Sequence, residues 1–308
     1  MNILIVGGAG HLGSHLCEKL IKDNNIHCLD TMLSGSFDNI KHLSRKDNFT
    51  LSLANIVTSE LDYLGTDFDY ILHLASPASP TLYKEYPLFT LETNTIGTKK
   101  LLDLAQTCGA RLIFTSTSEV YGDPLEHPQK ETYFGNVNCY GPRSMYDEGK
   151  RAGEAIVRIY QQQGVNAGIV RLFNTYGPRM KPDDGRVVPN FIVSALEDKK
   201  IELHNAGLQT RSFCYVDDTV DGIIKYMESD ETEPMNIGNP DEITIKDLAV
   251  RVKTLCDSKS KLIIKPPRDE EDPSQRCPDI GRAKRIKFKP KVSLNDGLEK
   301  TINYFKSQ

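Results

Sequence analysis

The stretch Asn2–Gly13, which reads NILIVGGAGHLG, decides the fold of this 308-residue chain. Its apolar run, Ile3–Val6, is typical of a buried strand, and Gly7, Gly10 and Gly13 follow at the start of a predicted helix. Glycines at these positions permit a tight turn and a close approach of the backbone to a pyrophosphate, while the helix N-terminus offers N–H groups and a positive dipole. The first thirty residues therefore predict a dinucleotide-binding β-α-β unit.

Asp30 ends the second predicted strand and indicates which dinucleotide binds. Its carboxylate can accept hydrogen bonds from the adenosine ribose hydroxyls and would repel a 2′-phosphate. The loop that follows, Thr31–Ser36, contains no arginine that could neutralise such a phosphate. We therefore expect NAD rather than NADP. The glycine spacing, G-x-x-G-x-x-G, resembles that of the extended short-chain dehydrogenase/reductase superfamily.

The first half of the chain alternates apolar strands with helical patterns, which predicts a doubly wound parallel α/β sheet of the Rossmann type, covered on both faces. The expected strands are Asn2–Gly7, Ile26–Asp30, Phe49–Leu53, Tyr70–Leu74, Arg111–Ser116 and Ala167–Leu172. The expected helices are Leu12–Lys22, Leu88–Cys108 and Tyr146–Gln163.

After Phe173 the elements become shorter, and loops rich in glycine and proline separate them. The charged run Arg268–Asp272 is typical of a surface loop. Helices are expected near 190–198, 217–228, 244–256 and 293–306, with a strand near 201–204. We predict an NAD-binding domain, residues 1–173 plus 214–235, and a smaller C-terminal α/β lobe for the substrate, residues 174–213 plus 236–308.

The composition, with 39% hydrophobic and 26% charged residues, is that of an ordinary soluble globular protein. A formal net charge of −4 argues against nucleic acid as the main partner, which would demand a basic face. The seven cysteines are scattered without a C-x-x-C pair, so we expect reduced thiols and neither a disulfide framework nor a metal site. Because no leader and no apolar run of about 18 residues is visible, we expect a cytoplasmic protein without a membrane partner.

Tyr146 and Lys150 lie four residues apart in a predicted helix and therefore share a face. A tyrosine titrates near ~10 and is a poor base at neutral pH, but a nearby ammonium and a positive nicotinamide both favour the phenolate. Tyr146 could then take a hydroxyl proton as hydride leaves the substrate. Taken alone, the pair is also consistent with two exposed helical residues.

Hydroxyl-bearing residues, Thr115–Ser118, follow the apolar strand segment Leu112–Phe114. Ligands of parallel α/β sheets bind beyond the carboxyl ends of the strands, so these hydroxyls could bond the reacting oxygen beside Tyr146. Glu119 comes next, and a carboxylate beside a redox centre is costly unless it is paired or used. Glu119 is therefore a candidate functional residue, with a hydrogen bond to a neighbouring loop amide as its alternative role.

Distinctive segments occur along the whole chain: His73–Ser79 (HLASPAS), Asn94–Thr98 (NTIGT), Thr115–Asp123 (TSTSEVYGD), Gly141–Arg151 (GPRSMYDEGKR), Phe173–Met180 (FNTYGPRM), Asp184–Val188 (DGRVV), Gln209–Phe213 (QTRSF) and Asp272–Ile280 (DPSQRCPDI). On these segments, together with the glycine turn and the Tyr/Lys pair, the chain resembles the UDP-glucuronate decarboxylases, also called UDP-xylose synthases. The resemblance covers essentially all 308 residues.

The resemblance implies a reaction in three stages on one bound NAD. Tyr146, helped by Thr117, takes the proton of the C4 hydroxyl while hydride passes to NAD; the resulting β-keto acid loses CO₂; C5 is then protonated and hydride returns, giving UDP-xylose. By the same resemblance Lys150 is catalytic, Glu119 positions the sugar ring or a water, and Arg276 holds the acid or diphosphate and organises C5 protonation. The alternative for Arg276 is a surface ion pair with the nearby acidic run.

The resemblance also assigns binding residues. Those expected to bind NAD are Gly7, Gly10, His11, Leu12, Gly13, Asp30, Ser34, Gly35, Asn55, Ile56, Leu74, Ser76, Thr93, Tyr146, Lys150, Thr175 and Arg186. Those expected to bind the UDP-sugar acid are Pro77, Ser79, Glu119, Tyr146, Asn174, Val188, Phe191, Arg211 and Arg276. Arg211 suits a diphosphate, because a guanidinium can bind phosphate oxygens in a bidentate way. The chain departs from the family pattern at Ser36, Asn55 and Glu92, which bears on the affinity for NAD and substrate.

Two other functions are compatible with part of the pattern. A sugar-nucleotide 4-epimerase or 4,6-dehydratase shares the glycine turn and the Tyr/Lys pair, although a dehydratase would be expected to carry Asp-Glu in place of Ser118-Glu119. A non-catalytic NAD-binding sensor has little reason to keep Tyr146, Lys150 and Thr117. Helices near 88–108 and 144–163 resemble those that form a four-helix dimer interface in the superfamily, so a homodimer is expected.

Overall fold

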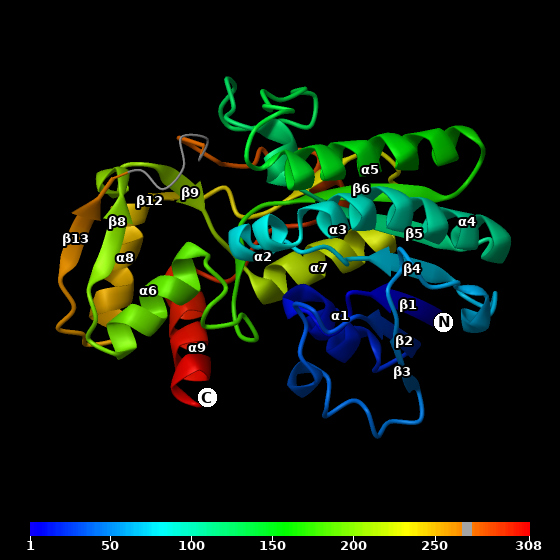
Figure 1. Ribbon diagram of the computed structural model, residues 1–308, viewed down its shortest axis with the longest axis horizontal. Coiled ribbons are helices and arrows are strands. Elements are labelled where there is room, and N and C mark those ends of the chain that lie inside the picture. The colour runs from blue at the N-terminus through cyan, green and yellow to red at the C-terminus, as the bar shows by residue number, and fades with distance from the viewer. Residues whose placement is uncertain (267–272) are drawn as a thin grey trace.

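The centre of the computed structural model, which describes residues 1–266 and 273–308, is a seven-stranded sheet (Figure 1). The strand order is β11-β6-β5-β4-β1-β2-β3, and every pairing is parallel. The strands are β1 (Asn2–Val6), β2 (Asn25–Asp30), β3 (Phe49–Leu53), β4 (Tyr70–His73), β5 (Arg111–Thr117), β6 (Ala167–Leu172) and β11 (Met235–Ile237). The predicted Rossmann-type sheet is confirmed, and each of its six predicted strands lies within one residue of the expected bounds.

Helices cover both faces of the sheet, because its strands are apolar on both sides. Ile3 and Ile5 of β1 lie in one hydrophobic cluster with residues of α1 (His11–Leu20) and α7 (Val216–Met227). The alternate residues of β1, Leu4 and Val6, lie in a second cluster with residues of α4 (Thr98–Cys108) and α5 (Ser144–Gln162). The predicted helix 88–108 is divided into α3 (Pro87–Glu92), a π-helical turn (Thr93–Gly97) and α4. Such turns are common at functional sites.

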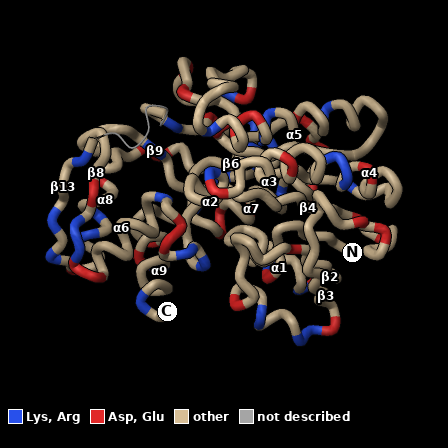
Figure 2. The backbone as a smooth tube through the Cα atoms, viewed as in Figure 1, with Lys and Arg blue, Asp and Glu red and all other residues tan. Residues whose placement is uncertain are grey.

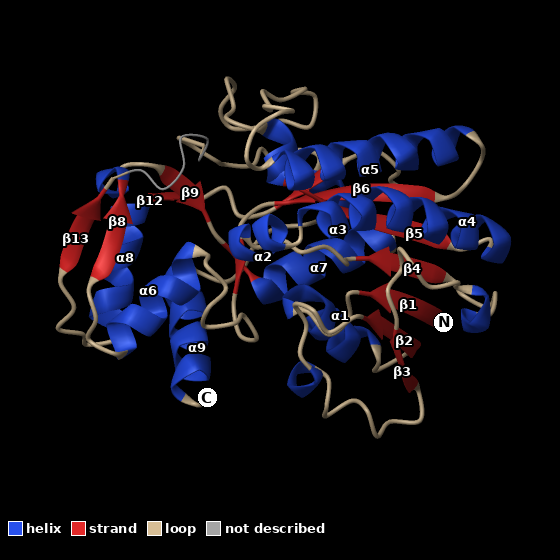
Figure 3. Cartoon of the chain, viewed as in Figure 1, coloured by secondary structure: helices blue, strands red, loops and turns tan. Residues whose placement is uncertain are grey.

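A second, smaller lobe stands beside the carboxyl ends of the strands (Figure 3). Its elements are α6 (Val187–Leu196), β8 (Ile201–His204), β9 (Thr210–Ser212), β12 (Glu242–Thr244), α8 (Ile245–Leu255), β13 (Leu262–Lys265) and α9 (Leu294–Lys306). β8 pairs with β13 in parallel and β9 with β12 in antiparallel orientation. Two further strands, β7 (Thr175–Tyr176) and β10 (Cys214–Tyr215), pair near the junction, and α2 (Pro80–Glu85) follows β4. The shortest of these elements were not predicted, since two or three residues show no periodicity.

The last strand of the main sheet, β11, corrects the predicted boundary at residue 235. β11 pairs with β6 through Met235↔Val170 to Ile237↔Leu172, so residues 236–237 belong with the sheet and not with the substrate lobe. The remaining division into two domains stays a prediction. The predicted surface loop Arg268–Asp272 lies outside the described residues.

The surface of the molecule mixes both signs of charge. Figure 2 shows acidic and basic residues interspersed along both lobes. Within residues 1–266 and 273–308, none of the helices combines the length and the apolar character that crossing a membrane would require.

The glycine turn is held by close backbone contacts and by Asp30. A Cβ atom at Gly13 would lie 2.1 Å from the carbonyl oxygen of Gly7, and Gly7 itself has a φ of +83°. The Asp30 carboxylate accepts hydrogen bonds from the N–H groups of Ala9 (2.9 Å) and Met32 (2.8 Å). Strand, turn and helix α1 are thus fixed as one unit.

Gly13→Ala should destabilise this unit, because the added methyl group must displace backbone. We expect a loss of about 1–3 kcal/mol in the free energy of unfolding and weaker binding of NAD. The matched control is Gly149→Ala in α5, where the nearest atoms lie at 3.5 Å and alanine favours the helix by about 0.5–1 kcal/mol. Denaturant unfolding and NAD titration measure both effects. Equal stability of the two variants would contradict the packing described.

Candidate active site

A cleft of about 1030 Å³ lies at the carboxyl ends of the central strands, between the sheet and the second lobe. All the residues predicted to be catalytic or to bind NAD or substrate line it, with the exception of Gly35. A Cβ at Gly35 would meet backbone and side-chain atoms of Ala9 at 3.0 Å, so this glycine packs behind the glycine turn. The tertiary structure therefore brings residues from Gly7 to Arg276 to one place.

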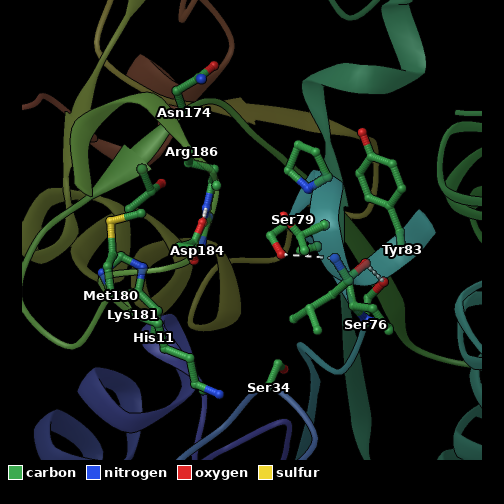
Figure 4. A pocket seen from close by; sticks show the side chains of 18 of the residues that line it. His11, Ser34, Ser76, Ser79, Tyr83, Asn174, Met180, Lys181, Asp184 and Arg186 are labelled. Carbon is green, nitrogen blue, oxygen red and sulfur yellow. Dashed lines mark hydrogen bonds and ion pairs between the residues drawn. The ribbon is translucent and has the colours of Figure 1, made fainter. Parts of the chain in front are cut away.

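The end of the cleft near α1 has the features that a dinucleotide needs. Helix α1 begins at the glycine turn with no side chain capping its N-terminus, so its positive end faces the cleft. His11 and Ser34 both line this end, and Figure 4 shows them in the lower part of the view. The Nε2 atom of His11 is buried and has no hydrogen-bond partner within the described chain. Burial lowers the pKa of His11 well below its ordinary value, so this ring is neutral and can bond a polar ligand.

Tyr146 and Lys150, on the first turns of α5, meet the carboxyl end of β5. Tyr146 is buried and hydrogen-bonded to Thr117. The Nζ atom of Lys150 donates to the carbonyl of Thr115 at 2.7 Å and lies 4.8 Å from the centroid of the Phe114 ring. The alternative of an exposed helical pair is thus wrong.

Burial dominates the protonation of this pair. It raises the pKa of Tyr146 to about 12, against the opposite effect of the Thr117 hydrogen bond. It lowers the pKa of Lys150 to about 7. The phenol therefore needs a positive charge beside it before it can act as a base near pH 7. This requirement is stronger than the sequence suggested, because the sequence does not reveal how completely both groups are buried.

Glu119 is held by two guanidinium groups. Arg276 forms a bidentate pair with it, Nη1–Oε1 and Nη2–Oε2 each at 2.6 Å, and Nη2 of Arg143 lies 2.6 Å from Oε2. Burial by itself would raise the pKa of Glu119, but Arg276 and Arg143 lower it to about 2. The carboxylate therefore stays ionised and pairs with arginines, not with a loop amide. The acidic run that was the alternative partner of Arg276 lies outside the described residues.

Three residues of the site were not singled out from the sequence. Arg143 is the second cation on Glu119, Asp147 lies beside it with its Oδ2 3.7 Å from Nε of Arg143, and the ring of Tyr83 stacks on Tyr146 with centroids 5.3 Å apart. Arg143 and Asp147 stand in the distinctive segment GPRSMYDEGKR, which was the available signal. No sequence motif marks Tyr83 as a site residue. Only the folded structure places this residue of α2 against Tyr146 of α5.

The substrate end of the cleft is lined from the second lobe. Asn174 presents an Oδ1 that is buried without a hydrogen-bond partner in the described chain, and Arg211 on β9 is buried with its Nη1 donating to the carbonyl of Thr210 at 2.8 Å. Arg186 forms a bidentate pair with Asp184, with Nη2–Oδ2 at 2.6 Å (Figure 4). A buried amide oxygen and two guanidinium groups thus line the cleft, as expected for a ligand site.

The model of the NAD dependent epimerase/dehydratase family matches residues 3–238. The chain belongs to this family. The family description agrees with the cofactor predicted from Asp30, so the expectation of NAD is confirmed.

Two curated members of the family give a narrower comparison. UDP-glucuronic acid decarboxylase 6 of Arabidopsis thaliana is 49% identical over 304 residues, which cover 97% of this chain and 87% of the relative. UDP-glucuronic acid decarboxylase 1 of Danio rerio is 46% identical over 98% of this chain and 72% of the relative. The prediction of an enzyme resembling the UDP-glucuronate decarboxylases is confirmed.

Solved structures share the whole architecture. The UDP-glucuronic acid 4-epimerase of Bacillus cereus, in complex with UDP-glucuronic acid and NAD, superposes with a TM-score of 0.91 at 29% identity and covers 100% of this chain and 99% of its own. The UDP-glucose 4-epimerase of Thermotoga maritima, with UDP-glucose, gives 0.91 at 30% identity with the same coverage. The fold is that of this family over its full length.

Asp147 makes the stability of this family member dependent on pH. Burial, followed by the charge of Glu119, raises the pKa of Asp147 to about 7 from 3.8. Between about pH 4 and 7 the folded protein therefore holds a proton that the unfolded chain has released, and stability falls as pH rises. Asparagine mimics the protonated acid. Asp147→Asn should gain stability over the wild type through this window, by about 1–4 kcal/mol at pH 8.

Denaturant unfolding of both proteins from pH 4 to 8 measures this difference. Glu148→Gln is the control, since Glu148 is half-buried on the same helix and pairs with Arg151 at 3.6 Å. The difference for Asp147→Asn should vanish near pH 4. A difference that stays constant over the whole range would show that Asp147 is ionised throughout.

Proposed function

We propose that this protein decarboxylates UDP-glucuronate to UDP-xylose through a 4-keto intermediate, with NAD regenerated in each cycle. The observation that carries the proposal is the buried Glu119–Arg276 pair beside Tyr146, in a chain 49% identical to a UDP-glucuronic acid decarboxylase. A 4-epimerase needs only to remove and return hydride at C4. A decarboxylase must also hold a carboxylate and protonate a neighbouring carbon, and the additional charged groups suit that requirement.

Tyr146 is the base for the C4 hydroxyl. Its hydrogen bond to Thr117 places a second hydroxyl next to the reacting oxygen. Lys150, one helical turn further along α5 on the same cleft, would favour loss of the phenolic proton when it is protonated. When bound, oxidised NAD supplies the hydride acceptor for C4 and a positive charge that also favours the phenolate. Ring stacking of Tyr83 on Tyr146 restricts the phenol to one orientation.

Glu119 and its arginines act on the second stage. The ketone at C4 makes the substrate a β-keto acid, so its carboxylate leaves as CO₂ while the electrons enter an enolate. Because Arg276 and Arg143 keep Glu119 ionised, this carboxylate is an acceptor that orients a sugar hydroxyl or a water and does not itself give up a proton at neutral pH. Arg276 is then available to balance the enolate charge while C5 is protonated.

The binding residues named from the sequence are proposed in the same roles. Gly7, Gly10 and Gly13, with the N-terminus of α1, would hold the NAD pyrophosphate, and Asp30 the adenosine ribose. Asn174 and Arg211 would hold the UDP. Support comes from their common position on the cleft and from the buried Oδ1 of Asn174.

A homodimer and a cytoplasmic location are further parts of the proposal. Helices α4 and α5 lie side by side on one face of the sheet (Figure 1). The π-helical turn that leads into α4 exposes Ile96 at 44% of its surface, and α5 exposes Ile159 at 51%. Apolar side chains on two adjacent helices suit a four-helix contact between two copies. All seven cysteines are free thiols, as expected for a reducing compartment.

The activity is tested by incubating the purified protein with UDP-glucuronate and identifying the products by NMR while measuring CO₂. The expected products are UDP-xylose and CO₂, without accumulation of NADH. UDP-galacturonate as the product would instead identify an epimerase. Absence of any turnover with NAD bound would overturn the proposal.

Tyr146→Phe should lower kcat by about 10²–10⁴-fold while NAD still binds, because only the proton-transferring hydroxyl is removed. Tyr160→Phe on the same helix is the matched control: its hydroxyl bonds Asp103, away from the cleft, and activity should stay within about twofold. Single-turnover formation of CO₂ and fluorescence titration with NAD separate catalysis from binding. Unchanged turnover in Tyr146→Phe would favour a non-catalytic NAD-binding role.

Ile159→Glu should convert the dimer to monomers, because a charge would be buried against the second copy. Val250→Glu is the control, since Val250 is 46% exposed on α8 of the second lobe. Sedimentation velocity gives the mass of both variants. A wild-type monomer, or dimers of equal strength in both variants, would contradict the proposed interface.

A further inference from the structure

Three side chains that commonly bind metal ions converge outside the cleft. They are His127 in the loop after β5, Glu242 at the start of β12, and Cys277 in the segment between β13 and α9. Their ligand atoms all lie within 4.8 Å of one another, and Nε2 of His127 is 3.1 Å from Oε2 of Glu242. In residues 1–266 and 273–308 this is the one group of three such side chains that converges in this way. We propose that these three residues form a binding site for a divalent cation of the zinc class.

The donor set fits this class of ion. Zinc takes imidazole nitrogen, thiolate sulfur and carboxylate oxygen at about 2.0–2.3 Å in tetrahedral geometry, which places ligand atoms about 3.3–3.8 Å apart. The His127–Glu242 separation of 3.1 Å is slightly shorter than this range, and the 4.8 Å limit on the other separations means that Cys277 Sγ has to approach by up to about 1 Å. A soft thiolate disfavours Mg²⁺ and Ca²⁺ as occupants. The fourth position is left for water.

Neighbouring groups hold the three ligands in place, as in established metal sites. Thr210 Oγ1 donates to the other carboxylate oxygen of Glu242 at 2.5 Å. The Gln129 side chain connects the remaining two ligands: its Oε1 accepts from the N–H of Cys277 at 2.8 Å, and its amide nitrogen lies 3.5 Å from Nδ1 of His127. The ligands are therefore oriented by the fold before a cation arrives.

The charge around the thiol favours a cation. The carboxylates of Glu242, Asp241 and Asp279 all lie near the Cys277 thiol. The thiol now donates to the carbonyl of Pro240 at 3.3 Å, so binding of the cation would release its proton to solvent and form the thiolate bond. A divalent ion would balance these negative charges.

The position of the site gives it a consequence for the active site. Cys277 directly follows Arg276, and Glu242 lies on β12, whose Ile243 pairs with Arg211 on β9. The N–H of Ser212 also donates to the carbonyl of Arg276 at 3.2 Å. A cation on these ligands would fasten together the two backbone segments that carry Arg276 and Arg211. None of the three ligands lines the cleft, so the ion would stabilise the site without touching substrate.

The test uses the full-length protein treated with a chelator and then titrated with Co²⁺. We expect one Co²⁺ per chain, a thiolate-to-cobalt charge-transfer band in the near ultraviolet, and displacement of that band by Zn²⁺. Cys277→Ser should abolish the band, whereas Cys139→Ser, at an exposed thiol, should retain it. His127→Gln should weaken Co²⁺ binding by about tenfold or more.

Zn²⁺ should also raise the thermal midpoint of the wild type and of Cys139→Ser, and leave that of His127→Gln unchanged. Circular dichroism establishes that each variant is folded, and His127→Gln decides the result if Cys277→Ser does not fold. The proposal is overturned if the folded wild type binds no stoichiometric Co²⁺, or if the charge-transfer band survives in Cys277→Ser.

Discussion

The buried carboxylate of Glu119, held between Arg276 and Arg143, is the interaction on which the active site depends. A charge removed from water is tolerated only when it is paired and hydrogen-bonded, and here three charged side chains share that requirement. Glu119 follows β5, Arg143 precedes α5, and Arg276 lies in the segment between β13 and α9. The ion pairs therefore fasten the C-terminal segment onto the sheet and close one wall of the cleft.

The same cluster sets the electrostatic character of the reaction centre. Two cations keep Glu119 ionised, and the negative charge that remains raises the pKa of the adjacent Asp147 to about 7, after the effect of burial. Tyr146 and Lys150 are pushed toward their neutral forms by burial. Groups with opposite protonation tendencies thus stand within one small volume, which suits a reaction in which protons leave and return at different stages.

The relatives show that the fold and the reaction are separate questions. The solved 4-epimerases share the fold over the full length at 29–30% identity, whereas enzymes named UDP-glucuronic acid decarboxylases reach 49%. The architecture therefore serves several reactions of nucleotide sugars, so the fold alone does not decide which reaction takes place. The proposed cation site, formed by His127, Glu242 and Cys277, lies outside the cleft. It would act on the cleft only through the backbone segments that carry Arg276 and Arg211.

The sequence by itself determined the sheet, the cofactor and the Tyr146/Lys150 pair. Each of these depends on residues that are close together in the sequence. They are an apolar run followed by spaced glycines, a carboxylate at the end of the next strand, and two residues one helical turn apart. Contacts between distant segments were decided only by the tertiary structure. Resemblance pointed to Glu119 and Arg276 separately, but not to their mutual pairing, to Arg143 as the third partner, or to the stacking of Tyr83. The short strands β9, β11 and β12 were also missed, because they depend on pairing with remote residues and not on local periodicity. The cysteine spacing gave no sign of a cation site, since its three ligands come together only when the loop, β12 and the C-terminal segment fold against one another.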